Sequence, residues 1–274
     1  MIGSSLQSSV EIAFRYDKAR SRTVLAKRQA GGLCHLSKPY WTGEVLGLQL
    51  VNPTAGLFSG DHLDVSVHVG PNSQVALTSP SASRYHTMPT GQAHLTQRFE
   101  IEDDAWLDFW PEIVIPQRES DVIQTTEIHL APTASTVFLD LLSPGRVAHG
   151  ERYQFRRLET RLEIRQSGNL LAKERCVLEP EHSSIWPLHV PGWDLCYYAA
   201  LWVAGQQAGK AIELLSQFPS NRATHQIGTS LVADRLGVVR IIANSSISLH
   251  KVANQLRKNL QQHLPLLTTS FRKL

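Results

Sequence analysis

Acidic side chains stand close together at two places in the sequence where they could act in acid–base chemistry. Asp61 and Asp64 form one pair, and Glu102, Asp103 and Asp104 form a run. Two carboxyl groups in unlike surroundings can differ in pKa, so that one donates a proton while the other accepts one. Charged turns and strand ends explain these residues more simply. A β-rich hydrolase with paired carboxylates, acting for example on carbohydrates, therefore remains an alternative.

Twelve histidines and three cysteines could supply metal ligands or nucleophiles, but their spacing matches no known site. The sequence has no HExxH, HxH or CxxC motif, and no GxSxG, P-loop or GxGxxG motif. His62 and His68 are an even number of residues apart, so they can share one face of a strand. Cys34, Cys176 and Cys196 are widely spread, as expected of buried thiols in a reducing cytoplasm. We therefore expect no catalytic residues and a protein that is not an enzyme.

The segments that would position these side chains have the pattern of β-strands over most of the first 180 residues. Apolar and polar residues alternate there, which is the period of a half-buried strand. The clearest examples are residues 10–16, 65–69, 95–101, 122–130 and 158–164. Turn-forming residues separate these segments, and Ser167-Gly168-Asn169 has the composition of a hairpin loop. The pattern predicts a mainly β fold, but it does not separate a solenoid of stacked strands from a sandwich.

The last third of the chain has a different pattern. Residues 193–203 are aromatic and apolar, and they fit either a buried strand or the start of a long helix. Gly205 and Gly209 favour the strand, because each costs a helix about 1 kcal/mol relative to Ala. We then expect a helix over about 208–218 and two strands, near 224–234 and 236–243.

A second helix is predicted at the C-terminal end, starting from a cap at Ser245 or Ser246 and ending at Pro265. Its apolar stripe consists of Leu249, Val252, Ala253, Leu256, Leu260 and Leu264. Arg257 and Lys258 lie off this stripe. No Pro-, Ser- or charge-rich linker divides the chain. We predict a single domain over 1–274, with a β-rich body over about 9–205 and a helix-strand-strand-helix end over about 206–274.

The composition excludes several classes of protein. The 274 residues carry a formal net charge of +3, with 42% hydrophobic and 19% charged residues and no block of like charges. This argues against nucleic-acid binding, and the low charged fraction suggests a surface covered by partners. Residues 1–22 lack the apolar core of a signal peptide, and no apolar run approaches the roughly 18 residues of a membrane span. We expect a cytoplasmic protein that binds neither nucleic acid nor a membrane.

One segment, residues 52–61 (NPTAGLFSGD), has an order that a long turn alone does not explain. Residues 64–67 (DVSV), 78–85 (TSPSASRY), 145–151 (GRVAHGE) and the pair Glu174-Arg175 follow it in sequence. Together they resemble the family of urease accessory proteins called UreD, or UreH in some organisms. The family patterns are close to NPPGGLVGGD, TTPGATKFYR and GRxAxGE, and the resemblance covers roughly residues 9–264.

The residues that match the family patterns are Asn52, Pro53, Gly56, Gly60, Asp61, Pro80, Gly145, Arg146, Gly150 and Glu151. The sequence departs from the patterns at Thr54, Ala55, Ser59 and Ser81, where the family usually has Pro or Gly. Loop conformations are therefore expected to differ at those four positions.

The resemblance implies a fold of strands stacked in a helical, β-helix-like arrangement, with about two helices near the C-terminus. It also implies a scaffold in urease maturation and not an enzyme. Such a scaffold binds UreF and, through it, the GTPase UreG, contacts apo-urease and assists nickel delivery to the urease active site. No cofactor is expected to bind tightly, and nickel would pass transiently through a tunnel. A β binding module without a metal role is a further alternative.

A passage for Ni²⁺ needs groups that hold the ion weakly, because a closed site of four ligands would trap it. Carboxylates that face a wet interior lower the electrostatic cost of a divalent cation. From their positions in or near the matched motifs and strands, the expected passage acids are Glu44, Asp61, Asp64, Asp140 and Glu174.

A surface for UreF is expected in the apolar C-terminal third, because large aromatic side chains are enriched at binding hot spots. The candidates are Trp193, Tyr197, Tyr198, Trp202, Leu256 and Leu260. Side chains of these types also fill protein cores, which is the competing explanation for each of them.

Overall fold

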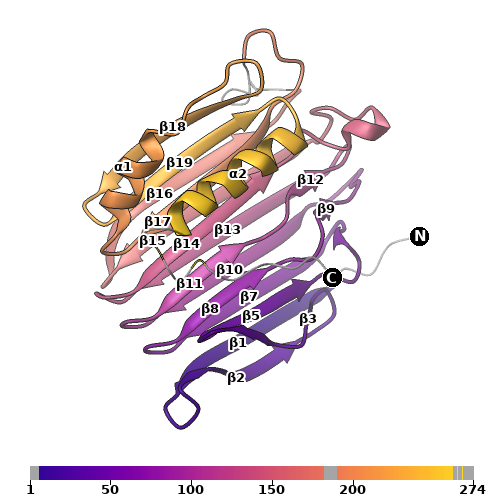
Figure 1. Ribbon diagram of the computed structural model, residues 1–274. Helices are drawn as coiled ribbons and strands as arrows, with labels where there is room; N and C mark the ends of the chain where they lie inside the picture. Colours follow the sequence, from indigo (N-terminus) through magenta and orange to yellow (C-terminus); the bar gives the residue numbers. More distant parts are fainter. Residues whose placement is uncertain (1–5, 182–189, 262–263, 265–266, 268–274) are drawn as a thin grey trace.

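The computed structural model describes residues 6–181, 190–261, 264 and 267, and its body is a β-solenoid of about four turns (Figure 1). Each turn gives one strand to each of two facing sheets, and three turns add a short strand on a third side. The first turn is β5 (Val45–Val51), β6 (Gly56–Leu57) and β7 (His62–Val69), and the second is β8 (Gln74–Thr78), β9 (Ser83–Tyr85) and β10 (Ala93–Ile101). The third is β11 (Trp106–Trp110), β12 (Val114–Pro116) and β13 (Asp121–Leu130), and the fourth is β14 (Ser135–Leu142), the short helix η1 (Val147–His149) and β15 (Arg157–Gln166).

Successive turns stack in parallel register. Leu46 lies opposite Val75, Val75 opposite Leu107, and Leu107 opposite Thr136, so neighbouring turns are offset by 29 to 32 residues. The strands recur at this spacing, but the residues at equivalent positions differ from turn to turn. The alternation of apolar and polar residues therefore predicts the strands but does not reveal the stacking.

Hairpins and additional strands extend both sheets. The chain starts with β1 (Gln7–Asp17), β2 (Arg22–Ala30), β3 (His35–Leu36) and β4 (Tyr40–Thr42), and it continues after the solenoid with β16 (Asn169–Leu178), β17 (Tyr197–Ala204), β18 (His225–Ala233) and β19 (Leu236–Ala243). The first sheet has the order β16-β15-β13-β10-β7-β1-β2. The main path of the second sheet is β18-β19-β17-β14-β11-β8-β5-β3. The turn predicted at Ser167-Gly168-Asn169 joins β15 to β16 and is confirmed as a hairpin.

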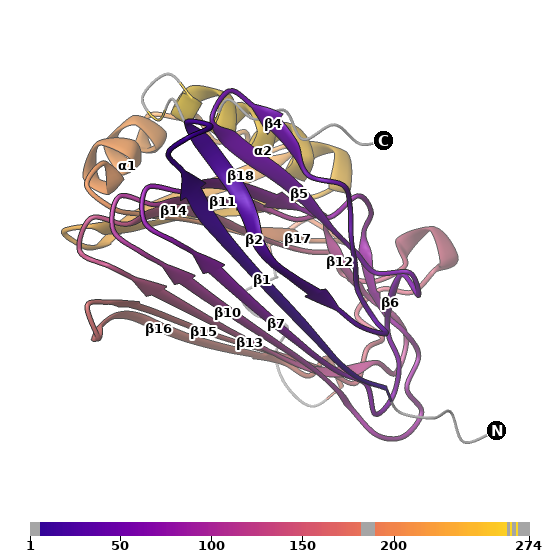
Figure 2. The same cartoon turned by 90° about the horizontal axis from the view of Figure 1, so that it is seen from below.

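The strands bury two cores. One lies between the sheets and includes Val67, Phe99 and Leu107. The other lies between the outer face of the second sheet and the helices α1 (Ala208–Ser216) and α2 (Ser246–Gln261). In Figure 2 both helices lie outside the layer that contains β11 and β14, while β7, β10 and β13 form the opposite layer.

The elements expected in the last third are confirmed, with small differences at their ends. Residues 197–204 form the strand β17, and α1, β18 and β19 follow in the predicted order. The last helix, α2, ends at Gln261, and Pro265 lies outside the described residues. Within the described chain, no helix combines the length and the apolar character needed to cross a membrane.

Arg257 is buried, which corrects the expectation that it lies off the packed face of the last helix. Its side chain is 7% exposed and forms an ion pair with Asp108 on β11, where Arg257 Nη1 donates to Asp108 Oδ1 at 2.8 Å. The guanidinium also lies over the ring of Trp110, 4.7 Å from its centroid. Helical spacing identifies apolar contact positions, but it does not reveal a buried partner 149 residues away.

Candidate functional site: a cavity between the two sheets

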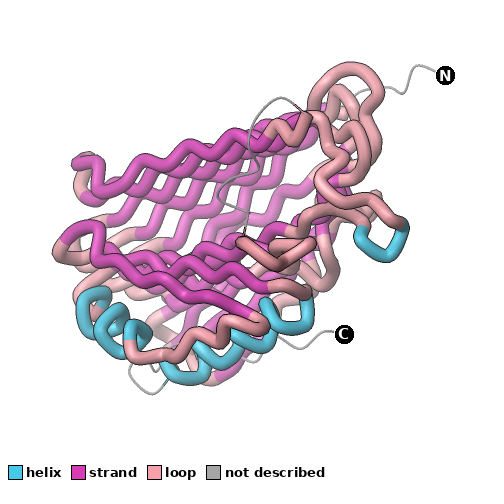
Figure 3. Tube along the Cα trace, turned by 90° about the horizontal axis from the view of Figure 1, so that it is seen from above, coloured by secondary structure: helices cyan, strands magenta, loops and turns pink. Residues whose placement is uncertain are grey.

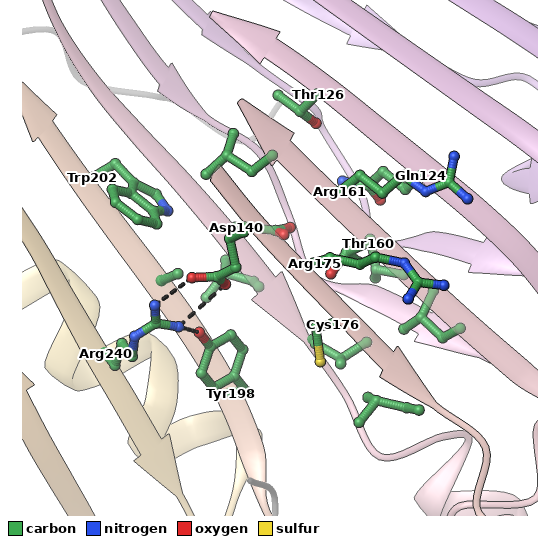
Figure 4. Close-up of a pocket in the computed structure, with 18 of the residues that line it drawn as sticks. Gln124, Thr126, Asp140, Thr160, Arg161, Arg175, Cys176, Tyr198, Trp202 and Arg240 are labelled. Atoms are coloured by element: carbon green, nitrogen blue, oxygen red, sulfur yellow. Dashed lines mark hydrogen bonds and ion pairs between the residues drawn. The ribbon is translucent and has the colours of Figure 1, made fainter. Parts of the chain in front are cut away.

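A cavity of about 370 Å³ lies between the two sheets at the last turns of the solenoid (Figure 4). Its walls come from β13, β14 and β15 and from β16, β17 and β19, and they include the apolar side chains of Phe138 and Trp202. The polar side chains of the lining are Gln124, Thr126, Asp140, Thr160, Arg161, Glu174, Arg175, Tyr198 and Arg240. An enclosed space with a few convergent polar groups is the usual setting for a small ligand or ion.

An ion pair bridges the two sheets at the rim of this cavity. Arg240 on β19 donates to both carboxylate oxygens of Glu174 on β16, with 3.2 Å between Nη1 and Oε1. Nη1 also donates to the Tyr198 hydroxyl at 2.7 Å, and Figure 4 shows these two side chains facing each other. The side chains of Glu174 and Arg240 are 29% and 43% exposed, so the pair stands between the cavity and solvent. The hydrogen bonds to Glu174 raise the pKa of Arg240, which therefore stays charged.

Asp140 lies deeper in the same cavity. Burial, with a smaller contribution from the negative charge of Glu174, raises the pKa of its carboxyl group to about 6, although a hydrogen bond from the Leu141 backbone opposes the shift. An acid with a pKa near 6 exchanges its proton close to neutral pH. Asp140 can therefore exist in the cavity either as a neutral acid or as a carboxylate ligand.

A second, smaller cavity of about 80 Å³ adjoins the first. The two share Val114, Gln124, Phe138 and Asp140 in their linings, and the smaller cavity extends to the motif loop at Asn52. Asp140 therefore stands where the two spaces meet.

Uncharged polar side chains of β9, β10 and β13 form hydrogen bonds with one another in the interior. The Tyr85 hydroxyl donates to Gln124 Oε1 at 2.6 Å, and Thr126 Oγ1 donates to Gln97 Oε1 at 3.2 Å. Tyr85 is 2% exposed, and burial raises the pKa of its hydroxyl well above the usual value. These groups offer oxygen atoms along the line from the motif loop to Asp140.

The structure places two of the five predicted passage acids, Asp140 and Glu174, in the lining of the cavity. Glu44 is exposed in the turn before β5, and Asp64 is exposed on the outer face of β7. The expectation that these two acids face the interior is therefore wrong. Outward-facing positions of a half-buried strand put a carboxylate into solvent at no desolvation cost.

Asp61 is buried, but it has a different role from the one expected. Its Oδ1 accepts the backbone N–H of Leu6 at 3.1 Å, and its Oδ2 accepts that of Phe58 at 2.8 Å. A carboxylate that accepts backbone N–H groups fixes the loop around it. Asp61 thus anchors the motif loop, and it is not among the residues that line the two cavities.

The loop 52–61 is held by short-range hydrogen bonds. Asn52 Oδ1 accepts the backbone N–H of Thr54 at 3.0 Å, and Asn52 Nδ2 donates to the Gly56 carbonyl at 3.1 Å. A Cβ at Gly56 would lie 1.7 Å from the Arg84 carbonyl oxygen, so β6 can approach β9 only with glycine there. Ala55 has a φ of +57°, a left-handed conformation that favours the glycine of the family pattern. Ala55 therefore adopts a backbone conformation for which the glycine of the family pattern is better suited.

The segment 145–151 closes the fourth turn. Arg146 Nε donates to Glu151 Oε2 at 2.8 Å, and the backbone N–H of Arg118 donates to the same oxygen at 3.2 Å. The hydrogen bonds from Arg146 hold the pKa of Glu151 below its usual value. A Cβ at Gly145 would lie 2.7 Å from the Glu151 carbonyl oxygen, and Gly150 ends η1 at a φ of +74°. The motif thus joins η1 to the end of β12.

Three further motif positions shape loops. Gly60 has a φ of +83°, and its N–H donates to the Gln92 carbonyl at 2.9 Å. Pro53 is exposed, and Pro80 is half-buried before β9. None of these three residues lines either cavity.

Four of the six predicted partner-binding residues are buried. Tyr197, Leu256 and Leu260 lie in the core beneath the helices, and Trp202 lies between the sheets, with exposures from 0% to 8%. Trp193 and Tyr198 are partly buried against the core between the sheets. The expected exposed surface at the four buried positions is therefore wrong, because the apolar stripe of α2 packs on the second sheet.

Arg240 and the uncharged polar side chains of the interior were not predicted from the sequence as residues of the site. A signal was present, because Gln97, Gln124, Thr126 and Thr160 stand on strand faces that are otherwise apolar, among Leu95, Phe99, Val122, Ile128, Leu158 and Leu162. A polar residue at an inward position of a strand points into the core. The ion pair of Arg240 carries no such signal, because its partner is 66 residues away.

Metal-binding side chains are dispersed in the part of the chain that the structure describes, where no three His, Cys, Asp or Glu residues come together as a metal site. His62 and His68 share the outer face of β7, as their spacing predicts. The three cysteines are free; two of them are buried, and Cys176 lines the cavity. Asp140 and Glu174 are therefore the acidic oxygen donors of the larger cavity.

Comparison with known proteins gives consistent matches. A family model described as UreD urease accessory protein matches residues 8–271. A urease accessory protein UreD of Opitutus terrae is 33% identical over 264 residues, which is 94% of this chain and 95% of the relative. A UreD of Klebsiella aerogenes is 30% identical over 254 residues, covering 91% of this chain and 90% of the relative. A UreH of Helicobacter hepaticus is 31% identical over 137 residues, half of this chain and 54% of the relative.

Proposed function

The chain belongs to the UreD family of urease accessory proteins, and we propose that it is a scaffold that binds UreF, reaches UreG through UreF, contacts apo-urease and assists nickel delivery. Members of this family take part in urease maturation and are not catalysts. The paired-carboxylate hydrolase is therefore excluded. The free thiols support a further part of the proposal, which is that the protein acts in the reducing cytoplasm.

The proposed role in nickel delivery is supported by the two adjoining cavities that meet at Asp140. Carboxylate, amide and hydroxyl oxygens line the way between them, and such ligands release a divalent cation more readily than thiolates do. Asp140 is the strongest of these donors, because its carboxylate lies where water cannot fully screen the charge of the ion. The arrangement supports transient passage and not storage.

Arg240 limits how tightly the rim of the larger cavity can hold a cation. Its guanidinium occupies both oxygens of Glu174, so this carboxylate is not free to join Asp140 in a two-acid site. The positive charge also repels a divalent ion near the rim. In this proposal Asp140 attracts the ion, and the neutralised Glu174 keeps the cavity from trapping it.

Co-expression of the chain with UreF, UreG and apo-urease tests the proposal. We expect a complex that remains intact through size-exclusion chromatography and a urease activity that depends on added nickel and on the presence of this chain. A matched culture without the chain serves as the control. Failure of the chain to bind UreF, or equal activation in the control, would contradict the proposed function.

A further inference from the structure

A groove of about 380 Å³ lies on the third side of the solenoid, away from the cavities described above. It is formed by β12, η1 and the start of α2, and we name it the β12 groove. Its lining includes Ile113, Ile115, Gln117, Arg146 and Val147. Figures 1 and 3 show η1 projecting at the end of the molecule opposite α1, beside the loops that close the turns.

The floor of the β12 groove is apolar. Ile113 and Ile115 project outward from the β12 segment, whereas the intervening Val114 faces the interior cavities. Tyr197 is 8% exposed and closes the floor, and the half-buried Val147 borders it from η1. The groove can therefore accept an apolar side chain.

The rim of the β12 groove is positively charged. Arg84 lies opposite Ile115 in the parallel pairing of β9 with β12, and its side chain is exposed. No described carboxylate lies within ion-pair distance of Arg84, whereas Arg146 is paired with Glu151. The charges of Arg84 and Arg146 add to burial in lowering the pKa of His86. A hydrogen bond to the Thr54 carbonyl and the charge of Asp61 oppose this shift.

Exposed apolar side chains flank the groove. Phe58 is 46% exposed and stacks on His86 with 4.1 Å between ring centroids, one strand beyond Arg84. Ile247 is 82% exposed and follows Ser246, which lines the groove. Large apolar side chains beside an unpaired arginine are the composition found at the centre of protein interfaces.

We propose that the β12 groove docks an acidic segment of a partner protein in the maturation complex. An Asp or Glu of that segment pairs with Arg84, and a neighbouring apolar side chain enters the groove between Ile115 and Val147. Charge complementarity favours this occupant over a second copy of the same chain, because two positive rims would repel each other. The inference rests on the proposed scaffold function, and it assigns a surface to one of the contacts that this function needs.

A photocrosslinker at the groove identifies the occupant directly. Val147→p-benzoyl-phenylalanine is assembled into the full complex with UreF, UreG and apo-urease, irradiated, and mapped by mass spectrometry. We expect a crosslink to a partner segment that contains an Asp or Glu next to an apolar residue. A crosslink to a second copy of this chain or to nucleic acid, or no crosslink in an assembled complex, would overturn the proposal.

A charge reversal measures the contribution of the arginine. Arg84→Glu should weaken the affinity for the crosslinked partner at least tenfold, and raising the salt concentration should reduce the difference from the wild type. Lys18→Glu, which reverses an exposed charge in the turn between β1 and β2, should change that affinity less than twofold. Both variants should keep the wild-type melting temperature.

The outcomes separate the two proposals. Unchanged affinity of Arg84→Glu for every partner would refute the groove while leaving the scaffold function intact. A wild-type chain that binds no maturation partner would contradict the scaffold function itself and, with it, the docking inference.

Discussion

Asp140 is the interior residue that we consider most important for the proposed function. Its carboxyl group borders both cavities, and its pKa of about 6 results first from burial and then from the negative charge of Glu174. A raised acid pKa means that the fold disfavours the charged form of the group. Retaining such a residue lowers stability, which is a common property of sites kept for function.

The raised pKa predicts a pH-dependent loss of stability. Between about pH 4 and pH 6 the native protein keeps a proton on Asp140 that the unfolded chain has released, so the free energy of unfolding falls as pH rises. Asp140→Asn removes this contribution and should raise the free energy of unfolding at pH 7 by roughly 1–3 kcal/mol. Urea titrations of both proteins across this range measure the difference. A difference that is equal at pH 4 and pH 7 would contradict the assignment.

The positions of some of these acidic residues could be predicted from the sequence, and those of others could not. Asp140 could be proposed because it follows the apolar, strand-like residues 137–139, and Glu174 because it stands in the Glu-Arg pair that matches the family motif. Asp64 follows the same rule of proximity to a motif and yet faces solvent, because its position in the alternation of β7 is outward. The phase of the alternation would have excluded Asp64, whereas the link between Glu174 and Arg240 depends on contacts between distant strands.

Among the elements, α2 shows how one side chain fixes a helix on a sheet. Its apolar stripe is predictable from spacing, and Leu249, Leu256 and Leu260 are all fully buried. The contact of Arg257 with Asp108 is not predictable, because a charged residue in a helix usually faces water. Burial raises the pKa of Asp108 even though the charge of Arg257 opposes the shift.

The buried pair predicts a large stability effect that depends on which partner is removed. Arg257→Met leaves the Asp108 carboxyl buried without its partner and should lower the free energy of unfolding by about 3–5 kcal/mol. The double variant Arg257→Met with Asp108→Leu removes both charges and should recover most of that loss. Chemical denaturation of the wild type and the two variants measures the effect. A double variant less stable than the single one would show that the ion pair itself stabilises the fold.

At the scale of the whole molecule, the solenoid explains why the two cavities lie in the interior. Stacked turns enclose the space between two sheets, and side chains fill that space where the inward positions are apolar. The cavity occurs where inward positions become polar, at Gln124, Thr126 and Thr160 of β13 and β15. The strand pattern and the two helices could be predicted from the sequence. The placement of the cavity could not, because it depends on the register of strands about 30 residues apart.

Nickel-dependent activation of urease by the Asp140→Asn variant tests the central claim most directly. The measurement compares the initial rate of activation at limiting nickel in complexes of equal, verified composition. We predict at least a fivefold lower rate for Asp140→Asn, and a rate within twofold of the wild type for Asp64→Asn, whose carboxylate lies on the outer face of β7. Wild-type activation by an intact complex that contains Asp140→Asn would contradict the claim that nickel passes through the interior cavities.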